Sequence, residues 1–114
     1  MQPPDTFAQQ WAAAWNSHDL DRILAHYRPD VRFRSNKALA LVGTGEVVGK
    51  QALRAYWQAA LDHQPALHFT VEEVFVGYRT LVITYTNHRG VRAAETLLFD
   101  DQGLVESASA CHLP

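Results

Sequence analysis

The start of the chain contains two consecutive amphipathic helix patterns. They restrict the possible folds of the chain more than any other feature of the sequence does. Phe7, Trp11 and Trp15 recur at every fourth residue and therefore share one face of a helix. A second apolar set at the spacing i, i+3, i+4 and i+7 defines another helical face: Leu20, Ile23, Leu24 and Tyr27. Helices with apolar faces this wide need a sheet to cover, so the rest of the chain must supply one.

Short polar segments mark the ends of these helices. We predict the first helix over residues 5–16. Asp19 can accept hydrogen bonds from the free N–H groups at the start of a second helix over residues 20–27. Pro29 then ends this helix, and the alternation of apolar and basic residues over 31–34 predicts a strand.

The remaining chain predicts one more helix and then only strands. Residues 35–49 hold three glycines among apolar residues, which favours a loop or small hairpin lying against the core. A third helix is predicted over residues 50–62. Four strands joined by tight turns follow, and such strands are antiparallel neighbours: residues 67–77, 80–87, 91–100 and 104–112.

The predicted order of elements is α-α-β-α-β-β-β-β, an α+β fold in one domain over residues 1–114. Strands of roughly ten residues twist and curl. The three helices would then pack on the concave face of a curved, mostly antiparallel sheet and complete a cone. Side chains at the closed end would form the core, and those near the open end would line a pocket.

Charge and composition exclude several classes of function. The formal net charge is −2, so no basic surplus exists to neutralise a nucleic-acid backbone. No apolar run approaches the roughly 18–20 residues of a membrane span, and the first residues lack the basic and apolar regions of a signal peptide. The single cysteine, Cys111, cannot form an intrachain disulfide. We therefore expect a cytoplasmic protein that binds neither nucleic acid nor membrane.

Metal-ligating residues show no recognised spacing. The HExxH and HxxxH motifs are absent, and the glycines of residues 43–49 lack the spacing of a phosphate-binding loop. His18 beside Asp19 is better explained as a turn residue next to a helix cap. Cys111 and His112 are neighbours on a strand and point to opposite faces, which argues against a Cys–His nucleophile pair. We expect no metal and no other cofactor.

Three stretches carry a resemblance to a known family: W(x3)WNSHDLDRILAHYRPDVRF over residues 11–33, VVGKQALRAYW over residues 47–57 and AAETLLFDDQGLVESASA over residues 93–110. In this order they resemble the NTF2-like superfamily of α+β cones, and the chain looks closest to its SnoaL-like and ketosteroid-isomerase-like branches. The resemblance implies a small-molecule ligand and a homodimer formed through the outer face of the sheet. The apolar and β-branched residues on both faces of residues 80–85 agree with such a contact.

The mechanism of ketosteroid isomerases provides a test of this resemblance. It uses an aspartate base, with a tyrosine and a protonated aspartate as the oxyanion hole. The resemblance places Ser35 at the position of the base, Trp11 at that of the tyrosine and Glu95 at that of the oxyanion acid. Serine cannot abstract a carbon-bound proton, and an indole N–H cannot share a proton with an enolate in the same way. We therefore do not expect a steroid isomerase of that mechanism.

Glu95 is the strongest catalytic candidate. It shares a strand face with Leu97 and Phe99, and a carboxyl on an apolar face has a raised pKa because burial disfavours its charge. Such a group suits a general acid or a donor to a carbonyl. Two structural alternatives stay open: an offset strand that exposes Glu95, or a buried Glu95 paired with an arginine such as Arg34.

His112 is the second catalytic candidate. If the last turn pairs Phe99 with Leu104, His112 faces Val91 and lies four residues from Glu95, roughly 13 Å at strand spacing. A substrate could lie between the two side chains. The alternative is a terminal histidine on a frayed strand end.

The aromatic residues are mostly core, yet on the inner faces of helices they can also line a pocket for a flat apolar ligand. We expect Tyr27 and Trp57 at the pocket wall, where their O–H and N–H groups could orient the ligand. The predicted substrate-binding residues are Trp11, Trp15, Tyr27, Phe33, Ser35, Tyr56, Trp57 and Leu97.

Three functions are compatible with the sequence. The leading hypothesis is a SnoaL-like protein that binds an apolar, carbonyl-bearing small molecule, with acid/base isomerase, cyclase or lyase chemistry at Glu95. The alternative is a non-catalytic ligand-binding or structural dimer, in which Glu95 is merely paired. A protein-binding module is the third, and it rests on family analogy alone.

Overall fold

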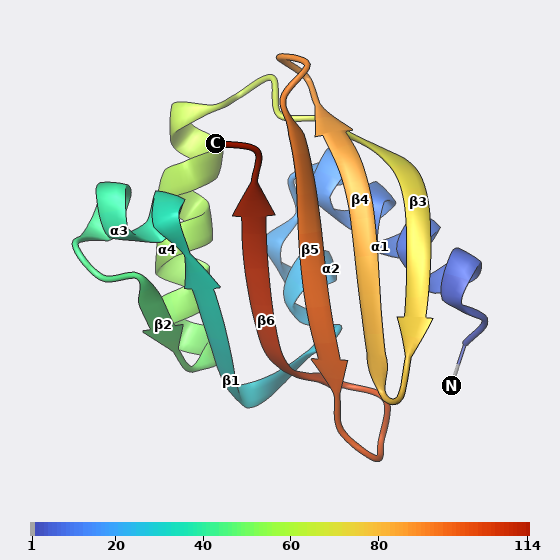
Figure 1. Ribbon diagram of the computed structural model, residues 1–114. Helices are drawn as coiled ribbons and strands as arrows, with labels where there is room; N and C mark the ends of the chain where they lie inside the picture. Colours follow the sequence, from blue (N-terminus) through green and yellow to red (C-terminus); the bar gives the residue numbers. More distant parts are fainter. Residues whose placement is uncertain (1) are drawn as a thin grey trace.

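A curved sheet of six strands organises the protein, which we describe from a computed structural model over residues 2–114. The strand order is β2-β1-β6-β5-β4-β3 (Figure 1). The strands are β1 (Tyr27–Ser35), β2 (Glu46–Val48), β3 (Phe69–Gly77), β4 (Thr80–Asn87), β5 (Arg92–Phe99) and β6 (Val105–His112). The helices are α1 (Pro4–Ser17), α2 (Leu20–Leu24), α3 (Asn36–Val42) and α4 (Lys50–His63).

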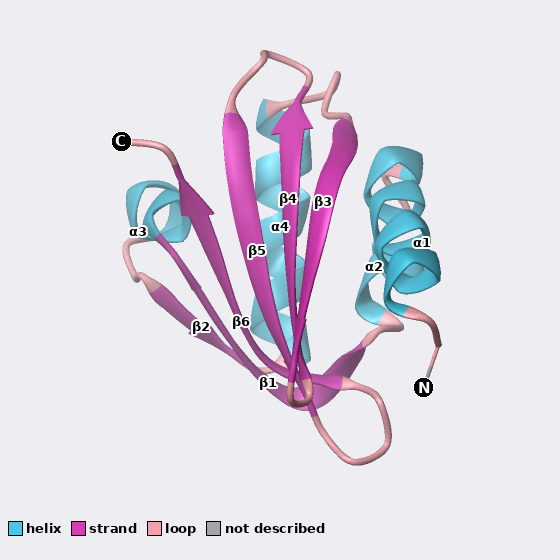
Figure 2. Ribbon diagram, turned by 45° about the vertical axis from the view of Figure 1, so that its right-hand side comes forward, coloured by secondary structure: helices cyan, strands magenta, loops and turns pink. Residues whose placement is uncertain are grey.

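The pairing confirms the predicted α+β fold. Strands β3 to β6 form the antiparallel meander that their tight turns predict, and β6 then pairs in parallel with β1. Helices α1, α2 and α4 lie on the concave side of the sheet (Figure 2), whose strands converge at one end and spread apart at the other.

The helix faces agree with the sequence pattern. Phe7, Trp11 and Trp15 are buried on the inner face of α1. Asp19 caps α2 as predicted, because its side chain accepts the N–H groups of Asp21 and Arg22. Within residues 2–114, none of the helices combines the length and the apolar character that a membrane span requires.

The predicted C-terminal boundary of the second helix is wrong. Helix α2 stops at Leu24, and Tyr27 is the first residue of β1. Pro29 lies inside this strand. Between Tyr27 and Arg32 the register of the β1–β6 ladder shifts, so the missing N–H of Pro29 falls where regular pairing is interrupted.

Residues 35–49 are also more ordered than the predicted loop or hairpin. The Ser35 side chain accepts the Lys37 N–H and caps α3, while Gly43 ends this helix with φ of 83°. Strand β2 then pairs with β1. The observed order is therefore α-α-β-α-β-α-β-β-β-β, with one helix and one short strand more than predicted.

Candidate functional site

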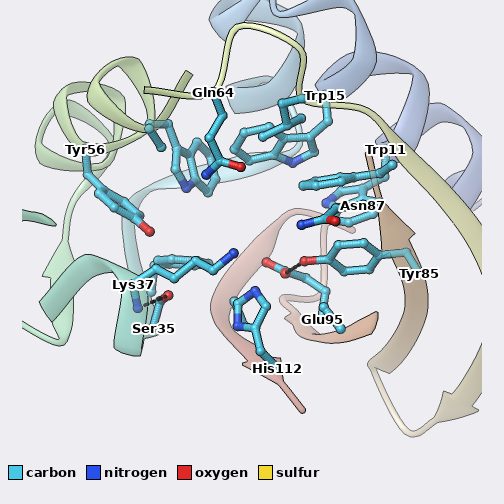
Figure 3. A pocket seen from close by; sticks show the side chains of 17 residues that line it. Trp11, Trp15, Ser35, Lys37, Tyr56, Gln64, Tyr85, Asn87, Glu95 and His112 are labelled. Atoms are coloured by element: carbon cyan, nitrogen blue, oxygen red, sulfur yellow. Dashed lines mark hydrogen bonds between the residues drawn. The ribbon is translucent and has the colours of Figure 1, made fainter. Parts of the chain in front are cut away.

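A cavity opens between the sheet and its helices (Figure 3). It is lined by the ends of β1, β4 and β6, the starts of β3 and β5, and parts of α1, α3 and α4. Its volume, counted as the space that the centre of a water-sized sphere can reach, is about 70 Å³. A single water needs about 10–15 Å³ of volume counted in this way. The cavity thus has room for several waters or for a compact ligand.

Seven of the seventeen residues that line the cavity are aromatic. The ring of Trp15 meets that of Trp57 edge-on at 4.8 Å between centroids, and Trp57 meets Phe33 in the same way at 5.4 Å. Trp11 stacks on Phe69 at 5.6 Å. Because each ring is held by another, the wall is preformed and offers flat apolar surfaces to a ligand.

Glu95 lies on the inner face of β5 and is, with Ser35, one of the two buried polar residues among residues 2–114. Its side chain is 4% exposed, and Tyr85 of the neighbouring strand donates its hydroxyl to Oε1 at 3.2 Å. The alternation of buried residues along β5 excludes the offset strand that would expose Glu95. Arg34 binds Glu46 instead, so the pairing of Glu95 with Arg34 is also wrong.

Burial decides the ionisation of Glu95. Removal from water raises its pKa from 4.5 to about 7, and the hydrogen bond from Tyr85 opposes this rise only in part. Burial, followed by the negative charge of Glu95, raises the pKa of both Tyr85 and Tyr27. Near neutral pH the carboxyl therefore exists in both its acid and its base form, while the two phenols keep their protons.

The predicted register of His112 is wrong by two residues. His112 pairs with Ala93 rather than Val91, which makes it a diagonal neighbour of Glu95 on the same face. The diagonal distance in such a ladder is about 7 Å, not 13 Å. The cause is a bulge next to Phe99 and a turn in which the Asp100 carboxylate accepts backbone N–H groups.

His112 lies at the cavity rim in a setting that disfavours its charged form. Burial, and then the nearby Lys37 ammonium, lower its pKa. An imidazole that is neutral at physiological pH can accept a proton or a hydrogen bond from a ligand. The catalytic role of His112, like that of Glu95, remains a prediction.

Six of the eight predicted substrate-binding residues line the cavity: Trp11, Trp15, Phe33, Ser35, Tyr56 and Trp57. Tyr27 and Leu97 are core residues that are not part of its lining. Tyr27 Oη accepts a hydrogen bond from Trp11 Nε1 at 3.4 Å, so it supports the wall from behind. The Trp15 Nε1 is buried with no hydrogen-bond partner in residues 2–114.

Three polar residues line the cavity although the sequence analysis did not predict them as site residues: Lys37, Gln64 and Asn87. Lys37 belongs to α3, which had been expected as a loop. The Asn87 carboxamide is fixed at the rim because its Oδ1 accepts the N–H groups of Arg89 and Val91. A serine followed by residues 36–42, which are mostly helix formers, was the signal that could have placed Lys37.

The cavity therefore combines one carboxyl that is poised near neutrality, one amine, one imidazole and several amide or hydroxyl groups. Ser35, at the expected position of a base, uses its hydroxyl to cap α3. Within residues 2–114, the structure brings together no group of three or more His, Cys, Asp or Glu side chains that could hold a metal ion. The arrangement suits proton transfer to or from a ligand oxygen or carbon.

Comparisons with known proteins give a consistent family. A family model described as a SnoaL-like domain matches residues 8–105. A solved SnoaL-like protein of unknown function from Burkholderia thailandensis is 33% identical over 97% of this chain and 94% of that chain, with a TM-score of 0.93. No curated protein matches the sequence.

Two further solved structures share the fold at low identity. TerC, crystallised with polyporic acid, is 15% identical over 97% of this chain and 92% of that chain, with a TM-score of 0.80. An NTF2-like protein of unknown function from Burkholderia pseudomallei is 16% identical over 99% of this chain and 92% of that chain, also with a TM-score of 0.80.

Proposed function

The chain belongs to the SnoaL-like family of NTF2-like folds, and on this premise we propose that it binds a small, flat, largely apolar molecule whose carbonyl or hydroxyl oxygen meets Glu95. The observation that carries the proposal is a carboxyl that is 4% exposed, accepts a hydrogen bond from Tyr85 and lines a cavity with seven aromatic residues. Its burial raises its pKa to about 7. TerC, which shares the fold, has been crystallised with a small organic molecule, polyporic acid, and this agrees with the proposal.

The chemistry proposed for this cavity is acid/base chemistry beside a carbonyl group. In its neutral form, Glu95 donates a hydrogen bond to the carbonyl oxygen and so favours the enol. In its ionised form, it takes a proton from the carbon next to the carbonyl. These two steps are the elements of isomerase, cyclase and lyase reactions, and the cavity supports both because the two forms of Glu95 coexist near pH 7.

Binding without turnover is the alternative function, and it has its own support. Two positions that carry the catalytic groups of ketosteroid isomerases hold Ser35 and Trp11 here. The Ser35 hydroxyl accepts the Lys37 N–H, and Trp11 donates its N–H to Tyr27. With these groups engaged, Glu95 would have to provide the acid/base function without them.

A deuterium-exchange experiment separates these functions. The probe is 2-tetralone, a flat two-ring ketone with acidic protons next to its carbonyl. Quenching of the fluorescence of the chain's three tryptophans reports binding, and proton NMR in D₂O reports exchange of those protons. We expect binding, and exchange that the Glu95→Gln variant loses while it still binds.

Each other outcome of this experiment has a defined meaning. Binding without exchange by the wild-type protein would favour the non-catalytic alternative. Absence of both binding and exchange would contradict a pocket for flat carbonyl compounds. Exchange that persists in Glu95→Gln would contradict the role of Glu95.

We also propose a homodimer through the outer face of the sheet. At the centre of this face Val82, Thr96 and Ser109 form one cross-strand row of uncharged side chains. Phe75 and Leu98 on the same face are 56% and 40% exposed. A surface whose centre is uncharged and partly apolar suits contact with a second copy of itself.

A further inference from the structure

The backbone of Lys37 is held at the mouth of the cavity by the cap of α3. Lys37 is the second residue of α3, and its backbone N–H donates to Ser35 Oγ at 3.1 Å. Its partly buried side chain points into the cavity, on the side where Glu95 and His112 lie (Figure 3). The helix start and the cap therefore direct an amine towards any bound ligand.

The Lys37 ammonium has no acidic partner in the part of the chain that the structure describes. All ion pairs of residues 2–114 are made by arginines, and no carboxylate lies within pairing distance of Lys37. A partly buried charge without a counter-charge is unfavourable. Burial, followed by the charge of Arg89, lowers the pKa of Lys37 accordingly.

The other titratable groups of the cavity leave this positive charge unbalanced. Arg89 in the β4–β5 turn lies outside the cavity lining and adds a second positive charge near Lys37. His112 on β6 brings no negative charge, and its lowered pKa keeps it neutral. The phenols Tyr56 and Tyr85, on α4 and β4, stay neutral because burial raises the pKa of each. Among the residues that the structure describes, Glu95 is the one carboxyl in the cavity lining, and it is mostly neutral below about pH 7.

We propose that the natural ligand is a small aromatic carboxylate, whose carboxylate oxygen contacts the Lys37 ammonium while its ring lies against the tryptophans. This inference rests on the proposed function, since it concerns the same cavity. The carboxylate supplies the counter-charge that Lys37 lacks, and the aromatic wall of Trp15 and Trp57 accepts the ring. Lys37 is thereby a specificity-determining residue that selects anions over neutral molecules of the same shape.

Two probes of equal shape and different charge test this proposal: 2-naphthoate, which is ionised at pH 6, and 2-naphthamide, which is neutral. The chain contains two lysines, and Lys50, which does not line the cavity, provides the matched control. Affinities are measured by tryptophan quenching at pH 6, below the pKa of Glu95. We expect wild-type protein and Lys50→Met to bind naphthoate about tenfold more tightly than naphthamide. Lys37→Met should bind both probes equally.

A second measurement on the unmutated protein does not depend on the folding of Lys37→Met. Reductive methylation with ¹³C-formaldehyde labels both lysines, and their NMR signals report each pKa. Naphthoate should raise the pKa of Lys37 and leave that of Lys50 unchanged, because an adjacent anion stabilises the ammonium.

The remaining outcomes separate the two proposals. Equal affinity of the wild-type protein for both probes, or a naphthoate preference that survives in Lys37→Met, would overturn the anionic ligand and leave the binding of 2-tetralone intact. Failure of 2-tetralone and of both naphthalene probes to bind would overturn the proposed function as well.

Discussion

At Glu95 two physical effects oppose each other, and burial is the larger. The carboxyl is removed from water on the inner face of β5, which favours its neutral form. Tyr85 donates a hydrogen bond to it and favours the charged form. A carboxyl whose folded pKa is raised stabilises the fold below its unfolded pKa, and this contribution is lost as pH rises through the folded pKa.

We expect the protein to lose stability between pH 5 and pH 8 because Glu95 must ionise while it is buried. A rise in pKa from 4.5 to about 7 corresponds to about 3 kcal/mol once the group is ionised. Urea unfolding of the wild-type protein and of Glu95→Gln at both pH values measures the effect. The variant should become relatively more stable at pH 8. If the free energy of unfolding changed equally with pH in the two proteins, Glu95 would ionise as easily in the folded protein as in the unfolded chain.

Some residues of the cavity were predictable from the sequence, and others were not. Glu95 was found because the period-two pattern of β5 already places it on the same face as Leu97 and Phe99. The position of His112 was missed because a bulge shifts register, and no residue pattern in the hairpin signals the bulge. Lys37 was missed together with its helix, and Tyr27 was expected in the cavity lining because it was assigned to a helix.

One side chain, that of Asn16, connects the end of α1 to the start of β3 by hydrogen bonds. Asn16 donates its Nδ2 to the Phe69 carbonyl at 3.0 Å, and its Oδ1 accepts the Phe69 N–H at 2.7 Å. The carboxamide thus pairs with the first residue of β3 as a neighbouring strand would. The ring of Phe69 forms part of the cavity wall, so this contact also sets the shape of the site.

Replacing Asn16 with alanine should destabilise the protein by about 2 kcal/mol, because it leaves two partly buried backbone groups of Phe69 without partners. The loss is measured by urea unfolding. Gln10→Ala, on the exposed face of α1, is the matched control. Asn16→Asp keeps the acceptor for the Phe69 N–H and should lie between the two. An Asn16→Ala variant as stable as the control would contradict this account.

Long elements were predictable from the sequence, whereas short ones were not. Helices α1 and α4, each of 14 residues, repeat their apolar positions over several turns, and β4 was predicted with its observed limits. Helices α2 and α3 have five and seven residues, too few for a periodic pattern to define their ends. Their limits depend on caps and on the pairing of β1 with β2 and β6.

The whole molecule presents one sheet face to its helices and leaves the other uncovered (Figure 2). The uncovered face carries alternate residues of β4 and β5, which are only partly exposed and largely uncharged. The concave face, by contrast, is filled by aromatic and aliphatic side chains except at the cavity. This asymmetry supports the proposal that a second copy covers the outer face and leaves the cavity mouth open to ligands.

Thr96→Arg should convert the proposed dimer into a monomer, because it places a charge at the centre of the outer face between Val82 and Ser109. Sedimentation velocity compares this variant with the wild-type protein and with Gln10→Arg, which adds the same charge on an exposed helix face. We expect the wild-type protein and the control to sediment as dimers. A wild-type monomer, or a dimer that persists in Thr96→Arg, would contradict the proposed interface.

Measurement of the pKa of Glu95 tests directly whether this carboxyl is buried in the cavity and can act as an acid and a base near neutral pH. Carbon-detected NMR follows the side-chain carboxyl carbon through a pH titration, and the spectrum of Glu95→Gln identifies its signal. A midpoint near 7 is the result that a buried carboxyl in the ligand cavity requires. A midpoint at or below the ordinary value of 4.5 would mean that Glu95 is solvated or ion-paired, and the acid/base function proposed for this cavity would then be wrong.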